Sequence, residues 1–481
     1  MESLAVSRLS NQTSRVERME GVDAGYLYME TPTMHMHTLK IAVVEPADTF
    51  DFAHLTSELL ARLDQLPSFK RRVLPVPFAL NHPLWVTDRK IDPARHVFHD
   101  AVPAPGGMAG LEALVGRIAS TPLDRSIPLW EVHVCEPFAD GRVAIVGKLH
   151  HSLADGVAAN AMLTNITDSP DPSVASTELG RPQPTYGLEP TPSRSTQVRL
   201  ALTDAIRQIA TLPALLWRTG TALVGLLSQR RRARVTVPRP VLDAPRSSFN
   251  GSLTERRNFA TGSLPLDEIK EVQRAHGVTV TDVVLAVVAG ALRQWMTDRG
   301  EWPSKPLVAG VPVATDKPGA PTRLGGNRVS NMFTSLATDI DDPHERLRTI
   351  ARVTAESKVV QRTLGYDMLV DWVQFSPPAP LSAAMRIYSK TGAASLHPPP
   401  FNVIVSSVRG PQERVKISGA GLDDLFSVGP ILEGIGLNVT AWSYVDRMNF
   451  SLLSCPDLIS DLGPLVAELR PALDALRKVE G

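Results

Sequence analysis

The feature that most constrains this chain is a run of seven residues, His150-His151-Ser152-Leu153-Ala154-Asp155-Gly156. It directly follows residues 142–149, an apolar-rich stretch typical of a buried strand, and a short helix is expected over about 157–167. Neighbouring side chains on a strand point to opposite faces, so only one of the two histidines can face a given cavity. A neutral imidazole there can accept a proton from an alcohol, thiol or amine near pH 7. The run therefore predicts a general base where a strand ends.

The same residues also permit a structural interpretation. Ser152 and Asp155 have the spacing of a capping box, in which Asp155 would satisfy amide donors at the start of the next helix. Gly156 would then serve only a tight turn. For Asp155 and Gly156 both interpretations stay open on the residue pattern alone.

Composition indicates a globular protein of a reducing, cytoplasmic compartment. Hydrophobic residues make up 43% and charged residues 21% of the 481 positions, as in chains with substantial cores. Fifty basic residues balance fifty acidic ones, so no overall charge favours nucleic acid. Cys135 and Cys455 lie far apart, without the spacing of a disulfide framework or metal site. The polar N-terminus is not a secretory signal, and no uncharged apolar run reaches the length of a membrane span.

Composition shifts along the chain predict three parts. Residues 1–167 would form an N-terminal domain that carries the histidine run. Residues 168–240 would consist of a linker rich in Pro, Ser, Thr and Gly followed by a long helix. Residues 241–481 would form a C-terminal domain with an apolar helix up to Trp295, several strands and a final amphipathic helix. We find no internal repeat, nucleotide-binding glycine loop or Gly-x-Ser-x-Gly elbow.

The long helical pattern, over about 197–227, ends in a basic cluster. Between Arg194 and Arg234, eight arginines stand against one acidic residue, Asp204, a local charge of about +7 (8 − 1). A basic helix with an apolar face is typical of a membrane-surface element. The alternative is a crossover helix packed between two domains, with a solvated cluster at its end. The first interpretation assigns the membrane contact to Arg230, Arg231, Arg232 and Arg234.

Three further segments have recognisable patterns. Pro128-Leu129-Trp130 leads into a strand about twenty residues before the histidines. Thr281-Asp282-Val283 opens a strongly apolar helix, and either Thr281 or Asp282 is a suitable N-cap. Asn402 begins a strand that ends in Ser406-Ser407-Val408-Arg409-Gly410-Pro411. Packing or capping is the simpler account of each segment taken alone.

Together these segments resemble the bacterial wax ester synthase/acyl-CoA:diacylglycerol acyltransferase family, especially actinobacterial triacylglycerol synthases. The histidine run resembles the active-site motif of the wider chloramphenicol-acetyltransferase-like superfamily. The resemblance extends from the segment around Asp23 to the C-terminal helix and so covers nearly the whole chain. It implies an α/β fold of two such domains, each a mixed sheet flanked by helices, with an active-site tunnel between them.

The resemblance also implies roles for individual residues. His151 would be the general base, His150 and Gly156 would complete the motif, and Asp155 would hold the loop through an arginine or a backbone amide. Two segments depart from the family, which usually has an amide where this chain has Thr281 and Ser407, so acceptor choice and rate are less certain. Substrate contacts are expected at Pro128, Leu129, Trp130, Thr281, Asp282, Asn402, Ser406 and Ser407.

The activity implied is acyl transfer from long-chain acyl-CoA to diacylglycerol, or to a long-chain alcohol, without a covalent intermediate. Acyl-CoA would be a co-substrate, and no cofactor or metal is expected. One rival is an acyltransferase or condensation-type enzyme of complex lipid assembly; another is a lipid-droplet-associated binding protein with a weak site. The expected location is the cytoplasm, at the surface of the inner membrane or of lipid droplets.

Overall fold

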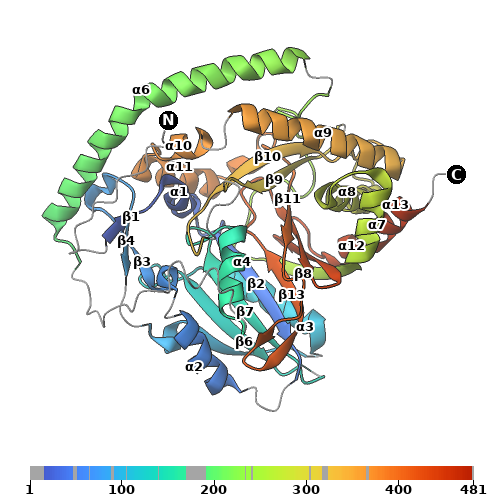
Figure 1. The fold of residues 1–481 in the computed structure, drawn as a ribbon, viewed down its shortest axis with the longest axis horizontal. Helices are drawn as coiled ribbons and strands as arrows, with labels where there is room; N and C mark the ends of the chain where they lie inside the picture. The colour runs from blue at the N-terminus through green and yellow to red at the C-terminus, as the bar shows by residue number, and fades with distance from the viewer. Residues whose placement is uncertain are drawn as a thin grey trace.

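Two six-stranded mixed sheets form the framework of the molecule (Figure 1). This computed structural model describes residues 16–478, apart from 47–50, 64–65, 88–90, 105, 139, 169–190, 233–234, 240–241, 303–304, 317–322 and 365–367. Each sheet contains parallel and antiparallel pairs and is flanked by helices. The predicted two-part α/β fold is confirmed.

The strands and helices have the following bounds. The first large sheet has the order β12 (Lys416–Ile417), β13 (Ala420–Val428), β2 (His37–Val44), β7 (Val143–His150), β6 (Trp130–Glu136) and β5 (Val97–Ala101). The second has the order β10 (Val329–Ser335), β9 (Val308–Ala314), β11 (Val403–Arg409), β14 (Leu437–Tyr444), β15 (Arg447–Ser454) and β8 (Asn258–Pro265). A small sheet has the order β1 (Val16–Arg18), β4 (Leu84–Thr87) and β3 (Arg71–Leu74). The helices are α1 (Gly21–Met29), α2 (Phe52–Leu63), α3 (Gly107–Ser120), α4 (Gly156–Asn165), α6 (Arg194–Arg232), α7 (Leu266–His276), α8 (Val280–Asp298), α9 (Pro343–Leu364), α10 (Met368–Val373), α11 (Pro378–Lys390), α12 (Gly463–Ala467) and α13 (Leu469–Arg477).

Strand β7 is mostly apolar because both of its faces are covered, and its charged residue Lys148 is paired with Glu131. Ala144 and Val146 pack in a cluster with α3, whereas Ile145 and Leu149 pack in another that includes Trp130. A strand buried on both faces reads as a continuous apolar run rather than an alternating one. The strand expected over 142–149 is therefore confirmed, and the helix expected over about 157–167 is α4.

The division between the two halves is not a single cut in the sequence. Strands β12 and β13 come from the predicted C-terminal domain, 241–481, but β13 pairs with β2 in the first sheet. A domain boundary drawn by composition cannot show this exchange, because strand pairing over such a separation leaves no local pattern.

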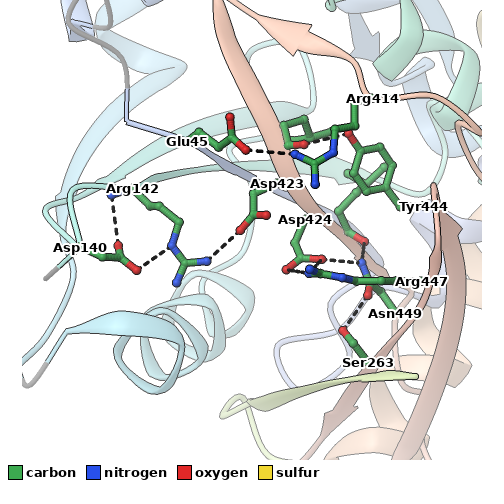
Figure 2. A network of polar contacts seen from close by, with 12 residues as sticks. Glu45, Asp140, Arg142, Ser263, Arg414, Asp423, Asp424, Tyr444, Arg447 and Asn449 are labelled. Atoms are coloured by element: carbon green, nitrogen blue, oxygen red, sulfur yellow. Dashed lines mark hydrogen bonds and ion pairs between the residues drawn. The ribbon is translucent and has the colours of Figure 1, made fainter. Parts of the chain in front are cut away.

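Ion pairs and hydrogen bonds hold the exchanged strand to both sheets (Figure 2). On the first sheet's side, Arg142 in the β6–β7 turn binds Asp423 with an Nη1–Oδ2 distance of 3.0 Å. On the second sheet's side, the guanidinium of Arg447 donates to both carboxylate oxygens of Asp424, at 3.0 and 2.9 Å. The amide of Asn449 also donates to Asp424 and to the carbonyl of Leu425. Strand β13 thus joins the two halves.

Helix α6 lies along the outside of the molecule (Figure 1). It contacts α9, α10 and the loop before β4, so it is not packed between the two sheets. Two described helices, α6 and α8, are long and apolar enough to cross a membrane by length and composition. Helix α8 is a core helix, because its apolar residues belong to the main cluster of the second half. Helix α6 is different, since only 6% of its most apolar window is buried.

The exchanged strand provides a stability prediction. Replacing Arg447 by methionine would leave the mostly buried Asp424 without its strongest donor, because bonds to charged groups are worth about 2 kcal/mol. Urea unfolding of Arg447→Met should show a loss of that order. The control is Arg414→Met, whose ion pair with Glu45 is largely exposed and should matter by less than about 1 kcal/mol. Equal losses in the two variants would contradict this role for β13.

Candidate active site

His151 lies one residue beyond β7, and its backbone is fixed by the neighbouring chain. Its amide donates to the carbonyl of Met36 at 2.7 Å. The imidazole stacks on the ring of Tyr26, with centroids 4.2 Å apart and an angle of 19° between the planes. Burial lowers the pKa of His151 below its usual range, so the ring is neutral near pH 7. A neutral ring of fixed orientation is what a general base requires.

Asn327 determines which ring nitrogen of His151 carries the proton. The Asn327 amide nitrogen faces two acceptors, a carboxylate oxygen of Asp23 at 2.7 Å and the carbonyl of His151 at 2.8 Å. Its Oδ1 must therefore accept the hydrogen bond from His151 Nδ1, at 3.1 Å. Since Nδ1 holds the proton, Nε2 presents a lone pair. Nε2 has no hydrogen-bond partner among the described residues, so it is available to a substrate.

Asp23 holds the side chain of Asn327 in place. Its side chain is buried on α1, and burial, aided by the nearby Glu20 and Asp155, raises the pKa of Asp23 to about 8 although Asn327 donates to it. Asp23 and Asn327 are absent from the predicted site, although the resemblance to the family begins at the segment around Asp23. A Gly-Gly-Asn turn at 325–327 was the available signal, but its contact with His151 is long-range.

His150 faces the opposite side and has a different partner. The amide of Ser152 donates to His150 Nδ1 at 3.1 Å, so the proton lies on Nε2, 3.5 Å from Glu30. Burial opposes ionisation of Glu30, but hydrogen bonds and charges from His150 and Arg125 lower its pKa to about 2. His150 Nε2 therefore lies close to a buried carboxylate, which indicates a structural role.

Asp155 clamps the histidine loop to the second half of the protein. One carboxylate oxygen accepts from Arg323 Nη2 and from the amide of Arg328, both at 2.8 Å. The other accepts from the amide of Ala158 at 3.0 Å, which caps α4. Leu153 and Ala154 also run beside Gly326 in a short parallel bridge. Both expected partners, an arginine and backbone amides, are thus present.

Pro128, Leu129 and Trp130 pack beside the strand that carries the histidines, and their predicted substrate contacts stay predictions. All three are buried, and the Leu129 carbonyl accepts from the amide of His150 at 3.0 Å. The indole of Trp130 donates to the carbonyl of Phe69 at 2.8 Å and stacks on His96. The triplet thus supports the strand that carries the histidines.

Two other predicted contacts are also structural. Asn402 is completely buried, and both protons of its amide are used, on the Pro245 carbonyl and on Asn250. Asp282 belongs to a capping box with Thr279, which is the N-cap in place of the expected Thr281 or Asp282. Both side chains bond groups of the protein itself, Asp282 locally and Asn402 over a long sequence separation, and a sequence pattern cannot separate this use from substrate binding.

Ser406, Ser407 and Thr281 are half-buried, and none forms a side-chain hydrogen bond with a described residue. Strand β11, which carries both serines, lies beside the histidine loop, since Val408 contacts the Gly156 position at the start of α4. Gly156 has no positive φ, and a Cβ added there would meet Val408 only at an ordinary van der Waals distance of 3.9 Å, so the fold does not explain why this position is a glycine. The predicted substrate contacts of Ser406, Ser407 and Thr281 stay predictions.

The basic cluster lies largely outside the described part of the chain. For Arg230, Arg231 and Arg232 only the helical backbone is described, and Arg234 is not described. Among the described residues, no group of three His, Cys, Asp or Glu side chains is placed to hold a metal ion.

The clamp at Asp155 gives a testable expectation. Replacing Arg323 by methionine would leave a buried carboxylate without its cation, a change that typically costs about 3 kcal/mol. We expect this loss in urea unfolding. Arg256→Met, which breaks an exposed pair with Asp457, should cost less than about 1 kcal/mol. An Arg323→Met protein as stable as wild type would argue against the clamp.

Comparison with known proteins now identifies the family. Residues 19–284 match the model of the wax ester synthase/diacylglycerol acyltransferase catalytic domain, and residues 325–477 match that of its C-terminal domain. A "putative diacylglycerol O-acyltransferase" of Mycobacterium tuberculosis is 35% identical over 97% of both chains. Another from the same organism is 36% identical over 93% of this chain and 87% of that one.

Solved structures agree. The wax ester synthase/diacylglycerol acyltransferase of Marinobacter aquaeolei is 26% identical, covers 95% of this chain and 98% of its own, and has a TM-score of 0.64. The first condensation domain of the calcium-dependent antibiotic synthetase, 14% identical over 97% of this chain and 98% of its own with a TM-score of 0.56, shares the fold. The chain therefore belongs to the wax ester synthase/diacylglycerol acyltransferase family.

Proposed function

We propose that this acyltransferase moves a long-chain acyl group from acyl-CoA to the free hydroxyl of diacylglycerol, with long-chain alcohols as further acceptors. The observation that carries the proposal is the neutral His151, with Nδ1 hydrogen-bonded to Asn327 and Nε2 free. The two mycobacterial relatives named as diacylglycerol O-acyltransferases support the choice of acceptor.

The chemistry follows from one base. His151 Nε2 removes the hydroxyl proton of the acceptor as its oxygen attacks the thioester carbonyl carbon, forming a tetrahedral oxyanion. The oxyanion collapses, the C–S bond breaks, and the imidazolium returns the proton to the departing CoA sulfur. The acyl group passes directly to the acceptor without a covalent enzyme intermediate. A positioned base contributes a factor of about a hundred to ten thousand, and positioning the two substrates contributes much of the rest.

His151→Ala should abolish CoA release from palmitoyl-CoA and diacylglycerol in a folded protein, because no other base occupies that position. In the wild type, kcat/KM should fall only below pH 6.5, the ordinary pKa of histidine, because burial lowers the pKa of His151 and the base must be unprotonated. Wild-type turnover by folded His151→Ala would refute the assignment. If kcat/KM already fell above pH 6.5 on the acidic side of the pH–rate profile (the acidic limb), the lowered pKa would be refuted.

Asn327 and Asp23 should act by positioning His151. Asn327→Ala removes an acceptor that favours the protonated ring, so the acidic limb should move to lower pH while kcat falls about a hundredfold. Asp23→Asn keeps an oxygen for the Asn327 amide and should retain most activity, whereas Asp23→Ala should resemble Asn327→Ala. The pH–rate profiles separate this role from a purely structural one, which would lower activity without moving the limb. Equal losses in Asp23→Asn and Asp23→Ala would count against it.

The enzyme also has to reach its lipid substrates, and we infer peripheral attachment at the cytoplasmic face of the inner membrane or at lipid droplets. The arginine-rich end of α6 supports this, since each surface arginine near anionic lipid contributes roughly 1 kcal/mol. Such attachment should weaken as salt screens the charges.

Vesicle co-sedimentation tests the arginine cluster. A protein with glutamine at Arg230, Arg231, Arg232 and Arg234 should bind anionic vesicles less tightly than wild type at low salt, and the difference should vanish at high salt. Equal binding at low salt would show that these arginines do not contribute.

A further inference from the structure

The outer face of α6 is apolar, and no element in the described part of the chain covers it. Seven of its large apolar side chains are exposed, Trp217 by 76%, Ile206 by 69% and Val224 by 67%. At about 100° per residue they follow one stripe, at Leu202, Ile206, Ile209, Leu216, Trp217, Leu223 and Val224. The stripe is about 30 Å long at 1.5 Å per residue. Soluble proteins rarely expose so much contiguous apolar surface without a binding purpose.

A neighbouring loop extends this surface. Phe78, in the turn Pro77–Ala79 before β4, is 88% exposed and has φ +59°, a left-handed conformation that bulky residues rarely adopt. The turn holds it there, as the amide of Ala79 donates to the Val76 carbonyl at 3.0 Å. Between this turn and the first half of α6 lies a groove of about 960 Å³, lined mainly by apolar side chains. Its volume suits a long hydrocarbon chain.

The inner face of α6 fixes the helix to the body along its length. Asp204 pairs with Arg18 at 2.8 Å, and Thr219 accepts from the indole of Trp372 at 2.9 Å. Farther along, the amide of Gln229 donates to Glu356 at 3.0 Å. Crossing a bilayer would break these bonds and place their polar groups in hydrocarbon. The helix is therefore built to lie on a surface.

Charge on α6 favours a lipid partner. Over residues 194–226 the helix carries four arginines and one aspartate, a net charge of +3 (4 − 1). Arg207 pairs with Asp204 within α6 and Arg218 pairs with Asp371 of α10, whereas Arg194 and Arg199 line the groove beside the stripe. Such cations lie at the level of phospholipid headgroups when an apolar stripe enters the acyl layer.

From these observations we propose that Phe78 and the outer stripe of α6 form one apolar docking surface that inserts into an anionic phospholipid leaflet, with the groove between them holding a lipid acyl chain. This deepens the proposed function, on which its biological role rests. It adds an apolar insertion surface that is distinct from the arginine cluster. The contribution of this apolar surface to binding remains when salt screens the charges. It also places an acyl-chain site at the lipid interface.

The test uses the full chain with Phe78→Ser and Trp217→Ser combined, and Trp302→Ser, an exposed tryptophan elsewhere, as the matched control. Vesicles of phosphatidylcholine and phosphatidylglycerol are sedimented at high salt, where arginine attraction is screened. The double variant should bind at least about tenfold more weakly, since each large apolar side chain is worth that much. The control should bind like wild type. Equal binding by the double variant would overturn the proposal.

Two further measurements make the result specific. Brominated phospholipid acyl chains should quench the fluorescence of wild type and Trp302→Phe, but much less that of Trp217→Phe. Absence of that difference would refute insertion of Trp217. Light scattering without lipid provides the alternative outcome, because a wild-type dimer lost in the double variant would assign the surface to a second copy of the chain.

Activity assays separate this proposal from the proposed function. With a short-chain acyl-CoA and a short-chain alcohol in solution, the single variant Trp217→Ser, whose side chain does not line the groove, should release CoA at the wild-type rate. With diacylglycerol in vesicles, its rate should fall with its binding. An inactive wild type that still shows the difference in vesicle binding would refute the acyl-transfer chemistry alone. Equal losses in the soluble and vesicle assays would refute the docking surface.

Discussion

The active site depends on the buried pair between Asp155 and Arg323. The histidine loop belongs to the first half of the chain, but its carboxylate is satisfied by a guanidinium and an amide from the second half. Because an unpaired charge in such a position is costly, the loop reaches this conformation only when the halves are docked. Arg323 also binds Asp316 and the carbonyl of Gly326, which fixes the turn that presents Asn327. One ion pair thus places both the base and the residue that orients it.

The two halves are also held together by strand β13, which belongs to the second half of the chain but pairs within the first sheet. Strand β13 pairs with β2, and β2 pairs in turn with β7, the strand that ends directly before His151. The second half therefore contributes a strand to the sheet that carries the base. Relative movement of the halves would have to break ladder hydrogen bonds and the Arg447–Asp424 pair. The geometry between His151 and Asn327 is therefore held by the architecture and not only by local contacts.

Local patterns in the sequence were enough to predict what is locally determined. The buried strand, the histidine loop and the long basic helix follow from periodicity and motif, and resemblance added the fold and His151. Asn327, Asp23 and Arg323 were missed because their roles arise only from contacts across the two halves. The hydrogen bonds of Asn402 and Trp130 to distant backbone carbonyls were also not predicted, because a motif does not show which way a side chain points. The exposure of the α6 stripe was likewise invisible, since periodicity cannot show which face of a helix is covered.

The choice of an amide beside His151 suits a base that has to stay unprotonated. A carboxylate at position 327 would favour the imidazolium by a unit or more of pKa, and a protonated ring cannot accept the proton of a hydroxyl. The neutral Asn327 fixes the tautomer without that effect. The carboxyl group of Asp23 contacts Asn327, which stands between it and the His151 ring. Burial raises the pKa of Asp23 to about 8, so this group is mostly protonated near pH 7. Orientation and basicity are thus set separately: hydrogen bonding across the two halves fixes the ring, and burial keeps it neutral.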